Sequence, residues 1–164
     1  MMKKIKELIE KVVFDIEPKV RVRVISSSDS RELAKEKKKF PFKLDNDVIV
    51  TVFTNLRKFS FKIKRGYIWN GADIPRVLWK FIGASTDNAF LIASMIHDFM
   101  LDERVFIYKD VLKEAMKISE YRRLTSLVFR EILKDHHTGT IKANVMAGAV
   151  DWFQKYIMRG NWRL

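Results

Sequence analysis

The first sixteen residues carry apolar side chains at the spacing of a helix. Apolar positions recur every three or four residues, and lysine and glutamate occupy most positions between them. The apolar stripe consists of Ile5, Leu8, Ile9, Val12, Val13 and Ile16, and Pro18 would end the helix. This pattern predicts a basic amphipathic helix that either covers its own domain or docks on a membrane or a partner.

Three later segments have the pattern of strands. Residues 20–25 alternate between apolar and polar side chains, residues 48–53 are rich in β-branched residues, and residues 59–63 alternate again. The four residues 54–57 are short enough to form a hairpin between the last two strands. We therefore expect a small antiparallel sheet with one buried face and one basic face.

A polar and highly charged stretch, residues 26–39, follows the first of these strands. Ser26–Ser30 has the composition of a loop that caps a short helix from Arg31. The stretch ends in three consecutive lysines, which is typical of a linker or a mobile arm. We therefore divide the chain into residues 1–39, with the amphipathic helix, one strand and the basic arm, and a compact domain over residues 40–164.

After Gly66 the apolar spacing changes to that of helices. Asp73 is placed to cap a helix that carries Pro75 in its first turn and ends at Gly83. The later predicted helices run from Thr86 or Asp87 to Met100, over 110–118, over 120–133 and, after a break at 136–139, over 141–158. The fold class is therefore α+β, with a small antiparallel sheet in the N-terminal half packed by a C-terminal bundle of four to five helices.

The composition is that of a folded chain rather than a disordered one. Of 164 residues, 48% are hydrophobic and 12% aromatic, and there are only six glycines and three prolines. The absence of cysteine excludes disulfides, thiolate metal sites and cysteine nucleophiles. The longest apolar run is too short to span a membrane, and the charged residues that follow Met1 and Met2 predict no signal peptide.

The charge is concentrated in the first part of the chain. The formal net charge is +12, and residues 1–65 contribute 18 basic and 9 acidic residues of the 32 and 20 in the whole chain. Such an excess favours nucleic acid, an acidic protein or an acidic membrane surface as a partner, although a charged run is often simply solvated. The candidate contact residues are Arg21, Arg23, Lys37, Lys38, Lys39, Lys62 and Lys64, with Trp162 as an exposed aromatic anchor in the tail.

The densest group of chemically active side chains is His97 and Asp98, with Asp73 upstream. Imidazole and carboxylate are both good metal ligands, so His97, Asp98 and Asp73, with His136 or His137, could form a small metal-dependent catalytic site. Alternatively, the same groups are buried and satisfy one another's hydrogen bonds, and this structural reading is the one we prefer. The chain has no histidine upstream of His97, which excludes the phosphohydrolases built on a His-Asp doublet.

Other catalytic motifs are missing from the sequence. There is no Gly-rich phosphate-binding loop, no Gly-x-Ser-x-Gly turn and no His-Glu-x-x-His helix. We therefore assign no catalytic residue and no cofactor, and we keep a divalent metal on His97 and Asp98 as the alternative.

Two short motifs carry a resemblance to a known family. Gly66-Tyr67-Ile68-Trp69-Asn70-Gly71-Ala72-Asp73-Ile74-Pro75-Arg76 is followed by Trp79 and then by His97-Asp98-Phe99-Met100-Leu101. This combination resembles the bacteriophage and prophage family called domain of unknown function thirteen-fifty-three, whose first motif is approximately Gly-Phe-x-Thr-Asp-Gly-Ala-Ser-Ile-Pro-Arg. The match covers about residues 40–155 and extends to Asp110, before an apolar helix. The resemblance implies a phage context and no particular activity.

The sequence departs from the family pattern at the first motif. Asn70 stands where the family has Asp, Asp73 where it has Ser, and Trp69 where it has Thr. A catalytic centre that needed the family carboxylate would be altered by Asn70, whereas a structural clasp would keep its hydrogen bonds. We therefore treat the motif residues as structural; they are Asn70, Gly71, Asp73, Pro75, Arg76, Trp79, His97, Asp98 and Asp110.

These observations lead to one preferred function and two alternatives. The preferred function is a phage-encoded virion or virion-assembly protein, associated with a tail, neck or capsid, that acts by protein–protein or protein–DNA contact. It would be found in the virion or in the cytoplasm of the infected cell, with other phage structural proteins as partners and self-association left open. The alternatives are a small metal-dependent hydrolase and a non-specific nucleic-acid-binding protein.

Overall fold

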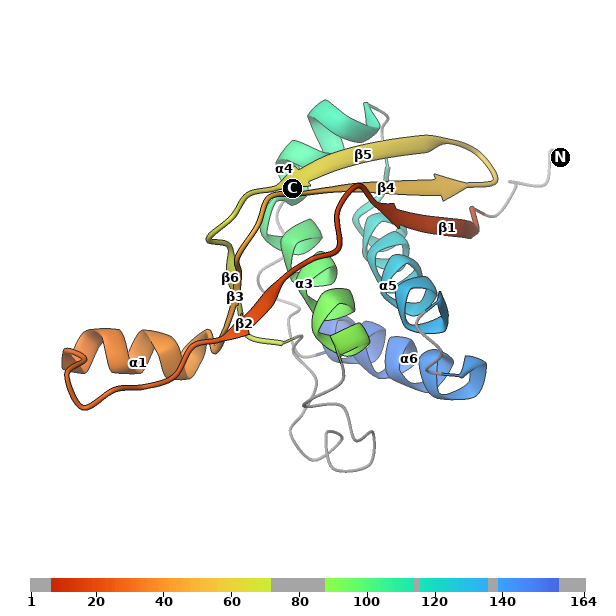
Figure 1. The fold of residues 1–164 in the computed structure, drawn as a ribbon. Coiled ribbons are helices and arrows are strands. Elements are labelled where there is room, and N and C mark those ends of the chain that lie inside the picture. The colour runs from red at the N-terminus through yellow and green to blue at the C-terminus, as the bar shows by residue number, and fades with distance from the viewer. Residues whose placement is uncertain (1–6, 72–87, 114–115, 136–138, 157–164) are drawn as a thin grey trace, which may run out of the picture.

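The fold is that of an α+β protein with strands first and helices after them, as predicted. The computed structural model describes residues 7–71, 88–113, 116–135 and 139–156 (Figure 1). The predicted helix between Asp73 and Gly83 lies outside the described residues.

The strands form two antiparallel sheets of three strands each, where the sequence led us to expect one. The first sheet has the order β1-β4-β5 and consists of Ile9–Phe14, Val48–Thr54 and Lys58–Ile63. The second has the order β2-β3-β6 and consists of Val20–Val22, Phe42–Leu44 and Ile68–Trp69. The strand predicted over residues 20–25 therefore ends at Val22 and belongs to the second sheet.

The predicted N-terminal amphipathic helix is wrong, because the segment is strand β1. It pairs with β4, and a bulge shifts the register between Ile9 and Lys11. A bulge inserts one extra residue, which places Ile9 and Val12 on the same buried face although they are three residues apart. The strand therefore imitates helical spacing, while Val12 and Val13 have the β-branched side chains that favour a strand.

The hairpin of β4 and β5 supplies the core of the first sheet. Its cross-strand pairs Val48–Ile63, Val50–Phe61 and Val52–Phe59 are all buried. The other face carries exposed Ile49, Lys58 and Lys62. Strict alternation of this kind is what buries one face of a strand, and it confirms the predicted strands and their connection.

Three long helices pack beneath and beside the sheets (Figure 1). These are α3 (Asn88–Asp102), α5 (Ile118–Asp135) and α6 (Thr140–Tyr156). Helix α5 packs against α3, α6 and β1, and eleven residues of α3 are buried. Among the described helices, none has the length and apolar character needed to cross a membrane.

The helix predicted over residues 110–118 is not formed as expected. A short helix α4 (Arg104–Phe106) continues into the π-helical turn η2 (Ile107–Leu112), which ends at Lys113 in the left-handed conformation (φ 54°). The wider π-helical turn places Ile107 and Leu112, five residues apart, together in the core. The predicted α-helix over residues 110–118 is therefore wrong in its described part, where η2 has the π-helical period.

Helix α1 (Arg31–Lys39) stands apart from the rest of the molecule (Figure 1). It lies in the excursion between β2 and β3, and Arg23 N–H donates to the carbonyl oxygen of Pro41 (2.7 Å) where the excursion begins and ends. The helix starts where the sequence predicted, with Ser30 as its N-cap, and none of its residues is buried. We call residues 24–40 the α1 arm.

Candidate functional site

Strand β6 and helix α3 bring the two sequence motifs together. The indole N–H of Trp69 donates to the hydroxyl of Ser94 (3.1 Å), and that hydroxyl donates to the carbonyl oxygen of Leu91 (2.9 Å). Trp69 and Ser94 are almost wholly buried. The hydrogen bond satisfies the one polar atom of a large buried side chain, so it fixes β6 on α3.

Tyr67 makes a second link between the motifs, because it contacts the part of α3 that follows His97. Its hydroxyl donates to Asp102 Oδ2 (2.7 Å), while its ring stacks on Trp69 (6.1 Å between centroids) and meets Phe99 edge-on (5.3 Å). Burial first, and then the negative charges of Asp102 and Asp98, raise the pKa of Tyr67 far above its ordinary value. The phenol therefore stays protonated and acts as a hydrogen-bond donor.

His97 is buried in the helical core beside Asp98. The imidazole is 1% exposed, its Nδ1 lies 3.4 Å from Asp98 Oδ1, and its ring meets Phe129 edge-on at 5.7 Å between centroids. Adjacent residues on a helix point about 100° apart, which agrees with this long contact. The surroundings of His97 are therefore those of a core residue that is packed and oriented by its neighbours.

The described residues do not assemble a metal site around this pair. No group of three histidine, aspartate or glutamate side chains within the described ranges is placed to hold a metal ion. Asp73, His136 and His137, which the metal alternative invokes, lie outside those ranges. Metal analysis of untagged protein, combined with melting in the presence of a chelator, tests that alternative directly.

The remaining motif residues are placed only in part. Asn70 is half-buried, and Gly71 is buried at φ 93°, a conformation that favours glycine at this turn. Asp110 lies on the exposed side of η2. The other motif positions, Asp73, Pro75, Arg76 and Trp79, are outside the described residues. Among the described motif residues, Tyr67 and Trp69 make side-chain hydrogen bonds to α3.

The candidate contact residues of the α1 arm fall into two groups. Lys37 and Arg23 are used inside the arm: Lys37 Nζ contacts both carboxylate oxygens of Asp29 (2.8 and 2.7 Å) and the carbonyl of Val24 (3.1 Å). Arg23 binds Glu36 (2.8 Å) and the carbonyl of Phe40 (3.2 Å). Lys38 and Lys39 are exposed, and Lys39 Nζ lies 5.1 Å from the centre of the Phe40 ring.

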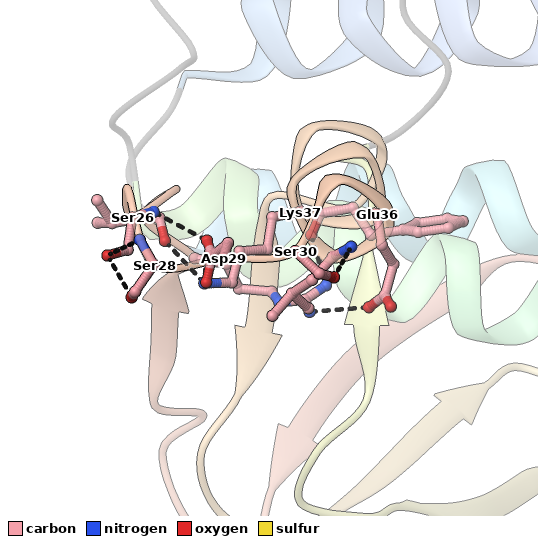
Figure 2. A network of polar contacts seen from close by, with 10 residues as sticks. Ser26, Ser28, Asp29, Ser30, Glu36 and Lys37 are labelled. Carbon is pink, nitrogen blue, oxygen red and sulfur yellow. Dashed lines mark hydrogen bonds and ion pairs between the residues drawn. The ribbon is translucent and has the colours of Figure 1, made fainter.

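The network in Figure 2 gives this exposed arm a defined shape. Asp29 also accepts a hydrogen bond from the Ser26 N–H (2.8 Å), and Ser30 accepts from the Leu33 N–H (3.1 Å). Hydrogen bonding to Lys37, and then to the Ser26 N–H, lowers the pKa of Asp29. The loop and the helix are therefore tied together by charged hydrogen bonds and not by apolar packing.

The other basic candidates lie on the sheets, and two of them have acidic partners. Arg21 on β2 pairs with Asp45 (3.1 Å), and Lys62 on β5 pairs with Asp47 (2.5 Å). Lys64 is exposed just after β5. Trp162 lies outside the described residues. The positive charge of these sheet residues is therefore partly neutralised, whereas Lys38 and Lys39 on helix α1 are exposed.

Some relevant contacts could not be predicted from the sequence. Glu7 binds Arg57 through two short hydrogen bonds (2.7 and 2.8 Å) and fastens the start of β1 to the β4–β5 turn. These residues are fifty positions apart, so only the fold brings them together. The Asp29–Lys37 pair has a weak signal in the sequence. The predicted capping loop contains the aspartate, the following helix contains the lysine, and the two segments are adjacent in the chain.

Comparison with known proteins gives one result. No match was found among curated proteins or solved structures. The family described as "Protein of unknown function (DUF1353)" matches residues 42–150, which include β3 to β6, α3, α5 and most of α6. This range covers most of the chain and contains both motifs that form the β6–α3 clasp. The chain belongs to the DUF1353 family, as its sequence motifs indicated.

Proposed function

We propose that this protein is a phage-encoded virion or virion-assembly protein that acts by contact, with the α1 arm as its docking element. The phage context comes from the resemblance of its motifs to a family of phages and prophages. The contact role is supported by the arm, because a helix with no buried residue contributes little to its own domain. The clasp of β6 and α3, in contrast, serves the fold.

The network of polar contacts within the arm is the observation that carries the proposal. Ordering an exposed segment costs conformational entropy that no apolar burial offsets in α1. The Asp29–Lys37 and Arg23–Glu36 pairs nevertheless hold the segment in one shape (Figure 2). A pre-ordered surface loses less entropy when it binds, so the arm is built as a docking element.

The surface of the arm favours an acidic protein as the partner. Arg31, Lys35 and Lys38 are exposed and share one face of α1, at the spacing i, i+4, i+7. Exposed aliphatic side chains lie on the same arm, namely Val24, Ile25 and Leu33. A combination of apolar residues with a charged rim is typical of protein–protein interfaces, and the positive rim selects an acidic partner surface.

Particle association tests this proposal. We would replace residues 24–40 with a short Gly-Ser linker, which keeps β2 and β3 because Arg23 and Pro41 already lie opposite each other. We expect the complete chain to co-purify with phage particles or assembly intermediates and the linker variant to be lost from them. A folded linker variant that still co-purifies at the same level would contradict the docking role.

Charge reversal gives a finer test without removing the arm. The variant Arg31→Glu, Lys35→Glu, Lys38→Glu should lose association, since it inverts the exposed face of α1. The matched control Lys11→Glu, Lys109→Glu, Lys117→Glu makes the same change in net charge at exposed positions elsewhere. Equal losses in both variants would indicate that net charge alone matters.

Nucleic-acid binding is the second candidate, and the basic face of α1 supports it. A row of cations along one helix face can follow a phosphate backbone. Fluorescence anisotropy with duplex DNA over a range of salt concentrations distinguishes the two candidates. Binding that weakens steeply with salt and disappears in the α1 charge reversal would support nucleic acid. No measurable binding at low salt would leave the acidic protein as the partner.

A further inference from the structure

Helix α6 has apolar residues on two opposite faces. One face contacts α5 and carries the buried residues Ala143, Met146, Ala147 and Val150. The opposite face carries exposed apolar residues at the spacing i, i+4, i+11, i+15: Ile141 (82% exposed), Val145 (62%), Trp152 (54%) and Tyr156 (47%). A surface helix normally has one apolar face, so the second face requires a neighbour. We call these four residues the α6 stripe.

The positions of the α6 stripe are symmetric about its centre, with aliphatic residues on one side and aromatic residues on the other. Val145 and Trp152 lie at equal distances from the midpoint between Gly148 and Ala149, and so do Ile141 and Tyr156. Small residues therefore lie in the middle and large ones towards both ends. In an antiparallel pair of identical helices, Val145 would face Trp152 of the other copy and Ile141 would face Tyr156. Spacing that is the same in both directions, with each aliphatic residue facing an aromatic one, fits a two-fold axis.

Gly148 supports close contact at this axis. A glycine inside a helix costs about 0.5–1 kcal/mol relative to alanine. No described atom lies within 4 Å of the place where a Cβ would stand, so the described residues of the chain give no reason for glycine here. A second helix crossing at Gly148 and Ala149 would supply that reason, because small residues allow two helices to approach closely.

The area of the stripe is sufficient for a weak dimer. A wholly covered Trp or Tyr buries about 150–250 Å², so the half-exposed Trp152 and Tyr156 of two copies would bury about 300–500 Å². The aliphatic residues and the flanking positions bring the total near the roughly 1,000 Å² that a specific interface needs. Each copy carries a net charge of +12, which opposes association at low salt.

We propose that α6 is a self-association surface, at which two copies of this chain pair antiparallel about Gly148 and Ala149. The partner is a second copy because the stripe pairs its aliphatic half with its aromatic half about a two-fold axis, and because it carries no charged residue. The interface is separate from the α1 arm. A dimer would therefore present two arms and strengthen attachment to a repetitive particle.

Sedimentation of the complete chain over a range of concentrations tests the proposal. We expect a reversible monomer–dimer equilibrium with a dissociation constant between about 10 µM and 1 mM, and tighter association as salt rises. Val145→Arg should abolish the dimer, whereas Ser119→Arg, which adds the same charge at an exposed site on α5, should leave it unchanged. A monomer at all concentrations would overturn the proposal.

Gly148→Leu separates pairing from folding. The position is exposed and open, and leucine is a better helix former, so thermal stability of the monomer should stay equal or rise. The dimer should nevertheless be lost, since the added side chain blocks close approach at the axis. A Gly148→Leu protein that dimerises as well as the original would contradict pairing at this point.

Orientation can be read from cysteine cross-linking, because the chain has no cysteine of its own. Copies carrying Val145→Cys, mixed with copies carrying Trp152→Cys, should form a disulfide-linked heterodimer under mild oxidation. Val145→Cys alone should cross-link poorly, since its two copies lie far apart along an antiparallel pair. Preferential Val145–Val145 cross-linking would indicate parallel helices and overturn the antiparallel arrangement.

Discussion

Single buried polar atoms decide how the two motifs of this family are held together. Trp69 lies in the first motif, Ser94 lies on α3 three residues before His97, and one hydrogen bond between them (3.1 Å) joins β6 to α3. The sequence indicated that the motifs form a structural clasp but named His97 and Asp98 as its centre. His97 contacts Asp98 on its own helix and Phe129 on α5, and Trp69 and Tyr67 make hydrogen bonds to α3. Spacing along the chain cannot show which side chains meet across a fold.

Replacing Ser94 with alanine tests the clasp. The change leaves the buried indole N–H of Trp69 without its acceptor, so unfolding free energy should fall by about 1–3 kcal/mol. Ser126→Ala is the matched control, because the Ser126 hydroxyl bonds only to the carbonyl of Arg122 one turn earlier on its own helix. Chemical denaturation measures both variants, and equal losses would contradict the special role of Ser94.

Glu7 gives a residue-scale prediction with a pH dependence. Hydrogen bonding to Arg57 lowers the pKa of Glu7 below 4.5, so the pair stabilises the fold at neutral pH and loses its effect as pH falls through the lowered pKa. Glu7→Gln should cost about 1 kcal/mol at pH 7 and progressively less below pH 4.5. Glu10→Gln, at an exposed position on β1, should have little effect. A pH-independent loss in Glu7→Gln would count against the ion pair.

At the scale of elements, most of the fold could be predicted from apolar spacing, and the errors have identifiable causes. β4, β5, α3, α5 and α6 lie close to where the sequence placed them, and the apolar residues of β4, β5 and α5 keep one period throughout. The prediction is wrong at β1, because a bulge gives this strand the apolar spacing of a helix. It is also wrong at η2, because a π-helical turn changes the spacing within a helix. Local irregularities of this kind depend on the partner element.

The α1 arm gives the prediction at this scale. Lys37→Gln removes the charge that joins Asp29 and the Val24 carbonyl, so amide hydrogen exchange should accelerate across residues 24–39. Exchange in β4 and β5 should be unchanged, because the arm makes no part of their hydrogen bonding. The control Lys38→Gln alters an exposed neighbour and should leave the arm protected. Unchanged exchange in Lys37→Gln would mean that other contacts order the arm.

At the scale of the whole molecule, the first 39 residues contain two kinds of structure. β1 and β2 pair with β4 and β3 of the later chain, whereas the α1 arm extends from the body (Figure 1). The charge pattern indicated the arm but did not separate it from the strands, since basic residues occur in both. Long-range strand pairing cannot be read from local composition.

Two deletions should therefore behave differently. Removal of residues 1–39 eliminates a strand from each sheet and uncovers buried Val50, Val52 and Leu44, so the product should be unfolded or aggregated. Replacement of residues 24–40 by a linker should leave a cooperative thermal transition close to that of the complete chain. Circular dichroism and melting compare the two, and a stable 40–164 fragment would contradict the structural role of β1 and β2.

The proposed docking role of the α1 arm requires that the arm can be removed from a body that stays folded. The most direct measurement is quantitative mass spectrometry of purified phage particles and assembly intermediates, made with either the complete chain or the linker variant of residues 24–40. We expect a fixed stoichiometry for the complete chain and its loss for the folded linker variant. Absence of the complete chain from every particle and intermediate, or equal incorporation of both proteins, would contradict it.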